Sequence, residues 1–127
     1  MAIIGHGIDI VETARIASMM ESHGGRFLSR CFTPAEVAYC QGHNKRVAEH
    51  LAGRFAVKEA ILKVLGTGWS GGISWTDMEI LPNAAGAPVL TLTGYSAEVA
   101  ARLGIRRWHV SISHIETHAM GSAIGED

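Results

Sequence analysis

The segment "GRFAVKEAILK", residues 53–63, decides how we expect this chain to fold, because it is mostly apolar and yet carries charges. It lies in a predicted helix from about Lys45 to Leu65 that ends at Gly66 and Gly68. At about 100° per residue, its large apolar side chains form two adjacent stripes. These side chains are Leu51, Phe55, Leu62 and Leu65 in one stripe, and Val57, Ile61 and Val64 in the other. A helix with so much apolar surface is expected to lie inside the core.

Glu59 and Lys63 lie about 40° apart on the remaining strip of this helix. Charged groups in a mostly buried helix are unfavourable unless they are paired or bound to something. The simplest interpretation is an i,i+4 pair on a solvated face, which contributes about 0.2–0.5 kcal/mol. The pair is flanked by Ala52, Ala56 and Ala60, which instead suggest an open floor under a ligand.

The N-terminal half is expected to contain one strand and two further helices. Residues 2–10 are short, apolar and interrupted by two glycines, which favours a strand with a close backbone approach. Residues 12–23 predict a helix that Gly24 and Gly25 end, with Ile16, Met19 and Met20 inward. The sequence "TPAE" at 33–36 predicts a helix start, with Thr33 as N-cap and Glu36 closing a capping box.

The C-terminal half alternates between strand and helix patterns without a regular βαβ rhythm. We expect strands at 77–81 and 88–93, a helix at 95–104, and a final hairpin of 108–114 and 118–124. This order predicts the α+β class, with helices packed on a small, mostly antiparallel sheet.

Composition excludes several functional classes. A chain of 127 residues predicts a single domain spanning 1–127. The net charge of −1 gives no global attraction to nucleic acid or membrane, and no apolar run approaches about 18 residues. The first residues lack the pattern of a signal peptide. Cys31 and Cys40 form no C-x-x-C pair, so we expect half-buried, reduced thiols and a cytoplasmic location.

A second carboxylate of interest is Asp9, which lies between Ile8 and Ile10 in a segment expected to be buried. A lone aspartate of this kind caps a turn or a helix at least as often as it binds a ligand. Two half-buried carboxylates, Asp9 and Glu59, nevertheless suit Mg²⁺, which keeps waters and completes its shell with phosphate oxygens.

Three other sites are less favoured by the pattern. A zinc site of His109, His114 and His118 is weak, because strand alternation puts His109 and His114 on opposite faces. The adjacency of Ser113 and His114 is not the geometry of a catalytic triad. The segment "GWSGG" at 68–72 matches the G-x-S-x-G nucleophile motif, but the expected helix before it makes this match a coincidence.

Three ordered motifs carry a resemblance to a known family. The segments "GIDIV", "GRFAVKEAILKVLGTG" and "HVSISH", together with "RFLSRCFTPAE", resemble the holo-[acyl-carrier-protein] synthases, the small phosphopantetheinyl transferases of bacterial fatty-acid synthesis. The likeness covers nearly the whole chain. It implies the α+β phosphopantetheinyl transferase fold and transfer of 4′-phosphopantetheine from coenzyme A to a serine of apo-acyl carrier protein.

The resemblance also implies roles for individual residues. Asp9 and Glu59 would bind Mg²⁺ at the coenzyme A pyrophosphate, and Lys63 would neutralise charge there. Arg54 and His114 would help to hold the nucleotide end and its 3′-phosphate. Asp9, Glu59 and Lys63 are thus the expected catalytic residues, in a homotrimer with sites between subunits.

A surface on the first helix is expected to bind the acidic, helical carrier protein. Ordinary surface arginines explain the same residues equally well from the pattern alone. With an acidic partner they form a docking face with an apolar centre. The expected carrier-binding residues are Arg15, Met19, Arg26 and Arg30.

Two departures from the family pattern concern charge. Where relatives usually have Asn-Gly-Lys-Pro, this chain has Ala85-Gly86-Ala87-Pro88, and Glu21-Ser22-His23 stands where an extra arginine is common. Two rival functions remain open from the sequence. One is a non-catalytic carrier- or nucleotide-binding module, and the other is a small metal-dependent hydrolase of a pyrophosphate bond.

Overall fold

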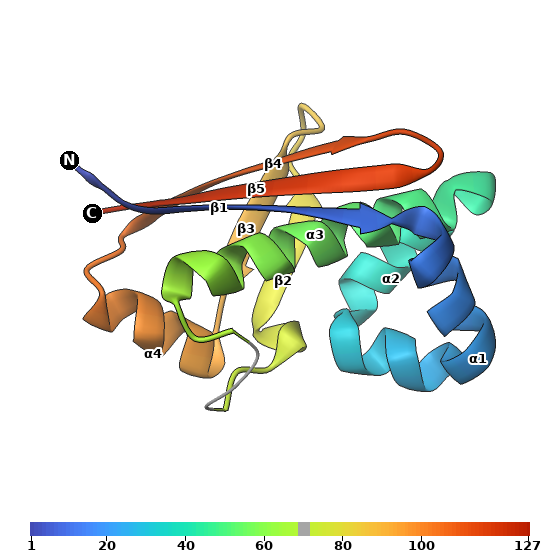
Figure 1. Cartoon of the computed structure of the whole chain (residues 1–127), viewed down its shortest axis with the longest axis horizontal. Helices are drawn as coiled ribbons and strands as arrows, with labels where there is room; N and C mark the ends of the chain where they lie inside the picture. Colours follow the sequence, from blue (N-terminus) through green and yellow to red (C-terminus); the bar gives the residue numbers. More distant parts are fainter. Residues whose placement is uncertain (69–71) are drawn as a thin grey trace.

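The computed structural model describes residues 1–68 and 72–127, which form five strands, four α-helices and two short 3-10 helices (Figure 1). The central three residues of the "GWSGG" segment at 68–72, residues 69–71, lie outside the described residues. In chain order the elements are β1 (Ile3–Glu12), α1 (Thr13–Cys31), α2 (Pro34–Gln41), η1 (Asn44–Arg46), α3 (Val47–Leu65), η2 (Trp75–Asp77), β2 (Met78–Pro82), β3 (Pro88–Leu92), α4 (Gly94–Arg102), β4 (Arg107–His114) and β5 (His118–Glu126).

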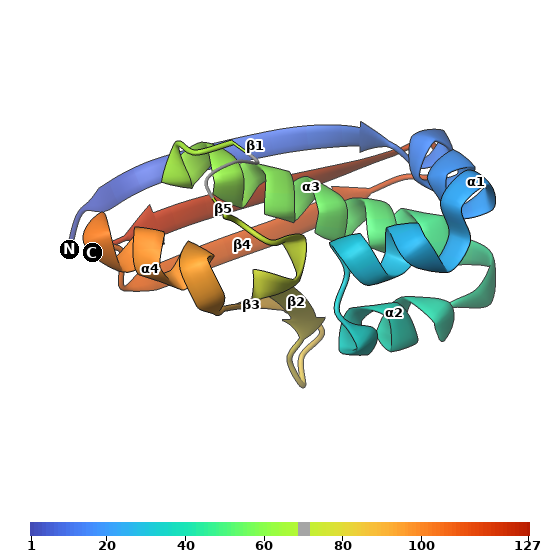
Figure 2. The ribbon, with the colours of Figure 1, turned by 90° about the horizontal axis from the view of Figure 1, so that it is seen from below.

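The main sheet is antiparallel, with strand order β1-β5-β4, and β2 and β3 form a separate hairpin. In Figures 1 and 2 the helices lie on one side of the main sheet, with α3 running along it. The α+β prediction is therefore confirmed. Asp9 in β1 pairs with Gly121 in β5, and Ile112 in β4 pairs with the same glycine, so β5 separates the two outer strands.

Helix α3 forms the centre of the core, as its two apolar stripes predicted. Every residue from Leu51 to Lys58 is buried. One half of the helix packs against Phe27, Phe32 and Cys40 of the α1–α2 region, and the other half packs against Ile80 and Ile105. This position explains why α3 is apolar on nearly all sides.

Small residues at the contact between α3 and the sheet allow the two backbones to approach closely. A Cβ atom on Gly7 would lie 2.1 Å from the carbonyl oxygen of Ala60, and one on Gly121 would lie 2.3 Å from the amide nitrogen of Val57. Ala52, Ala56 and Ala60 are fully buried. The interpretation of these alanines as an open floor under a ligand is therefore wrong.

Local signals placed most helix ends, with one exception. Thr33 and Glu36 form the predicted capping box, and Gly66 ends α3 in the left-handed conformation with φ 74°. The predicted helix end at Gly24 is confirmed, because Gly24, with φ 49° and ψ −127°, is non-helical and separates two helical segments within α1. The exception is the second segment, which continues to Cys31 and was not predicted. The part of α1 after the kink at Gly24 forms a surface separate from that of the first part.

Two observations bear on the expected environment of the chain. Cys31 and Cys40 are free and both are buried, more deeply than the half-buried thiols expected. Burial raises the pKa of the Cys40 thiol to about 11. Among the described residues, no helix has both the length and the apolar character needed to cross a membrane.

Candidate active site

Asp9, Glu59 and Lys63 meet where β1 crosses α3. Residues of β1 alternate, so Asp9 shares the inner face with Gly7, whose close contact brings the strand against the helix. The Nζ atom of Lys63 donates to the carbonyl of Ile8 at 2.7 Å and to Oδ1 of Asp9 at 3.2 Å. Glu59 lies one helical turn before Lys63 on the same face.

The Glu59 carboxyl is partly buried and close enough to Asp9 for their charges to interact. Burial raises the pKa of Glu59 above its usual range, and the Asp9 charge raises it further. Arg15 and Lys63 oppose this shift. The two carboxylates thus repel each other, and a divalent cation between them would relieve that repulsion.

The donor set fits Mg²⁺ better than zinc. Asp9 and Glu59 supply hard oxygen ligands and leave most of the coordination shell to water and phosphate. Within the described part of the chain, no group of three or more His, Cys, Asp or Glu side chains is placed to hold a metal. The candidate metal centre is the pair of carboxylates, Asp9 and Glu59.

Arg54 and His114 come together in a different place, on a hollow of about 120 Å³. Arg54 is buried, and it donates to the carbonyls of Ile80 at 3.0 Å and His50 at 3.2 Å. Its guanidinium lies 4.6 Å from the centre of the Tyr39 ring. Nδ1 of His114 lies 2.9 Å from Oε1 of Glu49.

Aromatic rings, among them those of His50 and His114, line the hollow beside Arg54. The His50 ring stacks on His43 with centroids 4.1 Å apart and meets His114 edge-on at 5.3 Å. Burial lowers the pKa of His50 to about 4, and the charges of His43, His114 and Arg54 lower it too, while Glu49 opposes. His50 is therefore a neutral ring at physiological pH.

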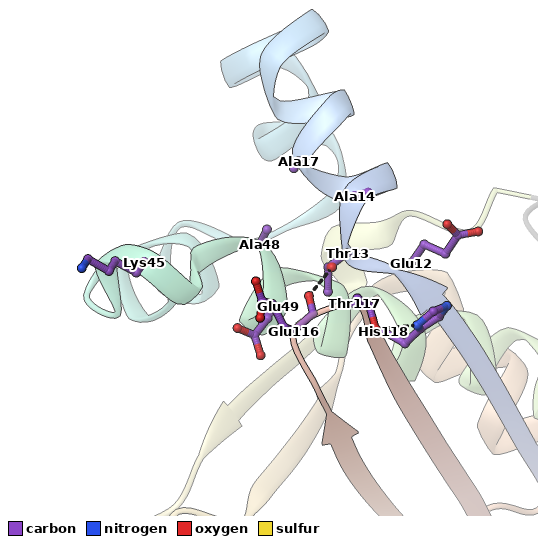
Figure 3. A pocket seen from close by; sticks show the side chains of 10 residues that line it. All are labelled: Glu12, Thr13, Ala14, Ala17, Lys45, Ala48, Glu49, Glu116, Thr117 and His118. Atoms are coloured by element: carbon purple, nitrogen blue, oxygen red, sulfur yellow. Dashed lines mark hydrogen bonds between the residues drawn. The ribbon is translucent and has the colours of Figure 1, made fainter.

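Two adjoining hollows contain residues that the sequence analysis did not select. One, of about 550 Å³, is lined by His114 together with Lys45 and Arg46. The other, of about 420 Å³, lies between the start of α1, the start of α3 and the β4–β5 turn (Figure 3). There the Thr13 hydroxyl donates to the carbonyl of Glu116. In the sequence, Lys45 and Arg46 could have been recognised as a basic pair directly before the start of α3.

The two groups of predicted residues lie at opposite edges of the main sheet. Asp9 is in β1 and His114 ends β4, with β5 between them. Glu59 and Arg54 are both in α3 but point about 140° apart. The structure brings together Asp9, Glu59 and Lys63, and separately Arg54 and His114.

Three of the four expected carrier-binding residues line one hollow of about 300 Å³. Met19, Arg26 and Arg30 surround it together with His23, Phe27 and Cys31. The kink at Gly24 separates the two parts of α1 that form it. Arg15 lies elsewhere on α1, 5.9 Å from the centre of the Phe55 ring, and its charge acts on Glu59.

Lys58 forms an ion pair that the sequence analysis did not foresee. Its Nζ atom lies 2.7 Å from Oε1 of Glu36, and both side chains are fully buried. Burial lowers the pKa of Lys58, and the Glu36 charge opposes this shift. The capping-box pattern identified Glu36, but nothing in the spacing indicated a lysine partner 22 residues away.

Comparisons with known proteins agree with this architecture. A family model described as the 4′-phosphopantetheinyl transferase superfamily matches residues 5–120. The holo-[acyl-carrier-protein] synthase of Koribacter versatilis is 49% identical over 125 residues, covering 98% of this chain and 99% of the relative. The synthase of Edwardsiella ictaluri is 44% identical over 126 residues, covering 99% of each chain.

Solved structures of similar proteins match over nearly the full length. The holo-[acyl-carrier-protein] synthase of Neisseria meningitidis gives a TM-score of 0.88 at 32% identity, covering 99% of this chain and 100% of that chain. The synthase of Helicobacter pylori in complex with coenzyme A gives 0.84 at 32% identity, covering 96% and 100%.

Proposed function

This chain belongs to the 4′-phosphopantetheinyl transferase superfamily and is an enzyme of that family, and from this premise we propose that it transfers 4′-phosphopantetheine from coenzyme A to a serine of an apo-acyl carrier protein. The products are holo-acyl carrier protein and adenosine 3′,5′-bisphosphate. The observation that carries the proposal is the group of Asp9, Glu59 and Lys63 where β1 crosses α3. Coenzyme A is also the ligand named for the Helicobacter pylori relative.

Phosphoryl transfer needs positioning and charge neutralisation more than covalent catalysis, and these residues suit that need. Asp9 and Glu59 would hold Mg²⁺, which when bound neutralises the pyrophosphate and polarises the phosphorus under attack. Lys63 has three N–H donors, and two of them already point to Ile8 and Asp9. We assign its remaining donor to a pyrophosphate oxygen.

The transfer exchanges one P–O bond for another. The serine oxygen bonds to the phosphorus that carries pantetheine, the bond from this phosphorus to the bridging oxygen breaks, and adenosine 3′,5′-bisphosphate leaves. The hydroxyl proton passes to Glu59 or to a water beside it.

We assign the nucleotide end of coenzyme A to the hollows lined by His114. Lys45 and Arg46 add positive charge there, next to Arg54 in the adjoining hollow. Ala87 is the last residue of the β2–β3 turn, and its neighbours Gly86 and Pro88 line the Arg54 hollow. Without the lysine usual in relatives, this turn offers no cation to the ligand.

We also propose a homotrimer with sites shared between subunits. The outer face of the main sheet exposes Ile8, Ile10 and Met120, and the helices of the described residues all lie on the other side of this sheet in Figure 1. His114 lies at the opposite sheet edge from Asp9, so one chain supplies the two halves at distant places. A closed ring would bring the halves of neighbouring chains together.

Subunit complementation tests the shared site. Inactive Glu59→Gln chains are mixed with inactive His114→Ala chains, subunits are exchanged, and transfer is measured. Shared sites predict partial recovery, because some interfaces then combine two intact halves. A light-scattering mass of one chain, or no recovery after proven exchange, would show that each subunit builds its site alone.

The function itself is tested by weighing the carrier. The full chain is incubated with coenzyme A, Mg²⁺ and apo-acyl carrier protein, and we expect the carrier to gain the mass of phosphopantetheine. Breakdown of coenzyme A without carrier modification would instead support a pyrophosphate hydrolase, and neither change would support a binding module. We further propose that residues 1–127 act as one domain in the cytoplasm, where Cys31 and Cys40 stay reduced.

A further inference from the structure

Lys58 is the most completely buried cation among the described residues, and all three of its N–H donors have acceptors. Its side chain is 0% exposed. Its Nζ atom donates to Oε1 of Glu36 at 2.7 Å, to the carbonyl of Cys31 at 2.7 Å and to the carbonyl of Trp75 at 3.2 Å. An ammonium has only three donors, so the site leaves none for a ligand.

Two of the three acceptors of Lys58 lie at the ends of α-helices. Cys31 is the last residue of α1, where backbone carbonyls lack partners within the helix and the helix dipole is negative. Glu36 is in the first turn of α2, where the helix dipole is positive. The ion pair therefore lies between two helix termini, and each charge faces the dipole end that it stabilises.

Glu36 extends the network to the β2–β3 hairpin. Its Oε1 atom also accepts from the amide of Thr33 at 2.9 Å, and its Oε2 atom accepts from the amide of Ile80 at 2.9 Å. The carbonyl of Ile80 accepts from Nε of Arg54. The peptide unit before Ile80 is therefore held by Glu36 of α2, and the peptide unit after Ile80 is held by Arg54 of α3.

The network also joins two regions that the proposed reaction requires. The Cys31 carbonyl ends the segment that carries Phe27, Arg26 and Arg30 of the carrier-docking hollow. Lys58 precedes Glu59, one of the two candidate metal ligands, on a helix whose backbone closely approaches the sheet. The buried side chain of Lys58 therefore connects the end of α1, which carries the docking hollow, to the position next to Glu59 in α3.

We infer that Lys58, paired with Glu36, is a positioning residue that sets the carrier-docking half of α1 relative to Glu59, so that the serine of a bound carrier reaches the pyrophosphate. This inference rests on the proposed function. Lys58 touches neither substrate nor metal. Its effect is geometric, and a misplacement of about 1 Å costs roughly 100-fold in rate in a reaction that depends on alignment.

The test uses two variants of the full chain and one control. Lys58→Met removes the cation and leaves Glu36 unpaired. Lys58→Met combined with Glu36→Gln removes both charges, so no buried ion is left without a partner. Ile105→Ala is the control, because Ile105 is buried against Gly125 and Val64, away from the network, and its truncation destabilises without touching α1.

Each protein is assayed for thermal unfolding, for kcat and KM towards apo-carrier at saturating coenzyme A, and for coenzyme A affinity. We expect the folded double variant to lose roughly 10- to 100-fold in kcat/KM for the carrier, while coenzyme A affinity stays near that of the wild type. Ile105→Ala should unfold at lower temperature and keep the wild-type kcat and KM per folded molecule.

Three outcomes would overturn the inference. Wild-type kcat and KM in the folded double variant would show that the pair only stabilises the fold. A parallel loss of coenzyme A affinity would place the defect in the site as a whole rather than in docking. No transfer by the wild-type protein would overturn the proposed function itself, and with it this positioning role.

Discussion

Lys58 and Glu59 are neighbours in α3 and face entirely different surroundings. Lys58 is fully buried, and its charge is matched by Glu36 and by two backbone carbonyls. Glu59 is only partly buried, and its closest charged neighbour of the same sign, Asp9, raises its pKa. One charge is satisfied by the protein, whereas the other is destabilised by it.

The contrast shows how to divide the charges of this helix between structure and chemistry. A buried charge with all its hydrogen bonds made holds elements together and has no capacity left for a ligand. A half-buried pair of like charges repels, Lys63 and Arg15 offset only part of this repulsion, and a bound cation would relieve it further. Arg54 combines the two roles, since two of its hydrogen bonds hold backbone carbonyls and it also lines a hollow.

The largest expected effect is on stability, at Lys58. Lys58→Met leaves the Glu36 carboxylate buried without its partner, which typically costs about 3–5 kcal/mol. Urea denaturation measures this loss. The same substitution at the exposed Lys45 is the matched control and should change the free energy of unfolding by about 0.5 kcal/mol or less. Equal effects at both positions would contradict the structural role of Lys58.

Glu59→Gln should lower activity without lowering stability. We expect kcat/KM for transfer to fall by at least about 100-fold, or roughly 2.7 kcal/mol, because the amide is a poor ligand and no base. The raised pKa means that ionised Glu59 disfavours the folded state above that pKa, so stability at neutral pH should be unchanged or higher. Near-normal turnover with Mg²⁺ limiting would remove Glu59 from the chemistry.

A smaller effect is expected on the docking surface. Arg26→Glu reverses a charge at the rim of the hollow on α1 and should weaken carrier binding roughly 10-fold, with a flatter salt dependence. Coenzyme A affinity should not change. Arg102→Glu on α4 makes the same charge change on another exposed surface and should leave carrier affinity intact. If the two variants behave alike at low salt, the carrier docks elsewhere.

The smallest effect is the pH dependence due to His50. Its pKa falls from 6.5 to about 4 in the folded chain, so between these values the unfolded chain binds more protons. Stability is therefore lost as pH falls from about 6.5 towards 4. His50→Asn should flatten this part of the profile, measured by thermal unfolding across the range. The exposed His23→Asn is the control, and an unchanged slope in His50→Asn would contradict a buried neutral ring.

The sequence predicted most of the fold because its signals are local. The capping box at Thr33, the glycine stop at Gly66 and the apolar stripes of α3 each depend on residues within a few positions of one another. The same local logic placed the helix end at Gly24, but it did not predict the second helical segment, which follows this glycine and ends at Cys31.

The site was harder to predict because its contacts join distant segments. Spacing placed Glu59, Lys63 and the alanines on one side of α3, but not the sheet that covers those alanines through Gly7 and Gly121. The contact of Lys63 with Asp9 spans 54 residues, and only the family resemblance suggested it. No periodicity links Lys58 to Glu36, so their pairing required the structure.

Binding of Mg²⁺ tests most directly whether Glu59 is a metal ligand while its neighbour Lys58 is structural. Thermal unfolding of the wild type, Glu59→Gln and the surface control Glu98→Gln is followed in coenzyme A with and without Mg²⁺. A ligand that binds only the folded state raises the unfolding temperature, so Mg²⁺ should stabilise the wild type and Glu98→Gln but not Glu59→Gln. Equal stabilisation of all three would contradict the assignment of Asp9 and Glu59 as the metal centre.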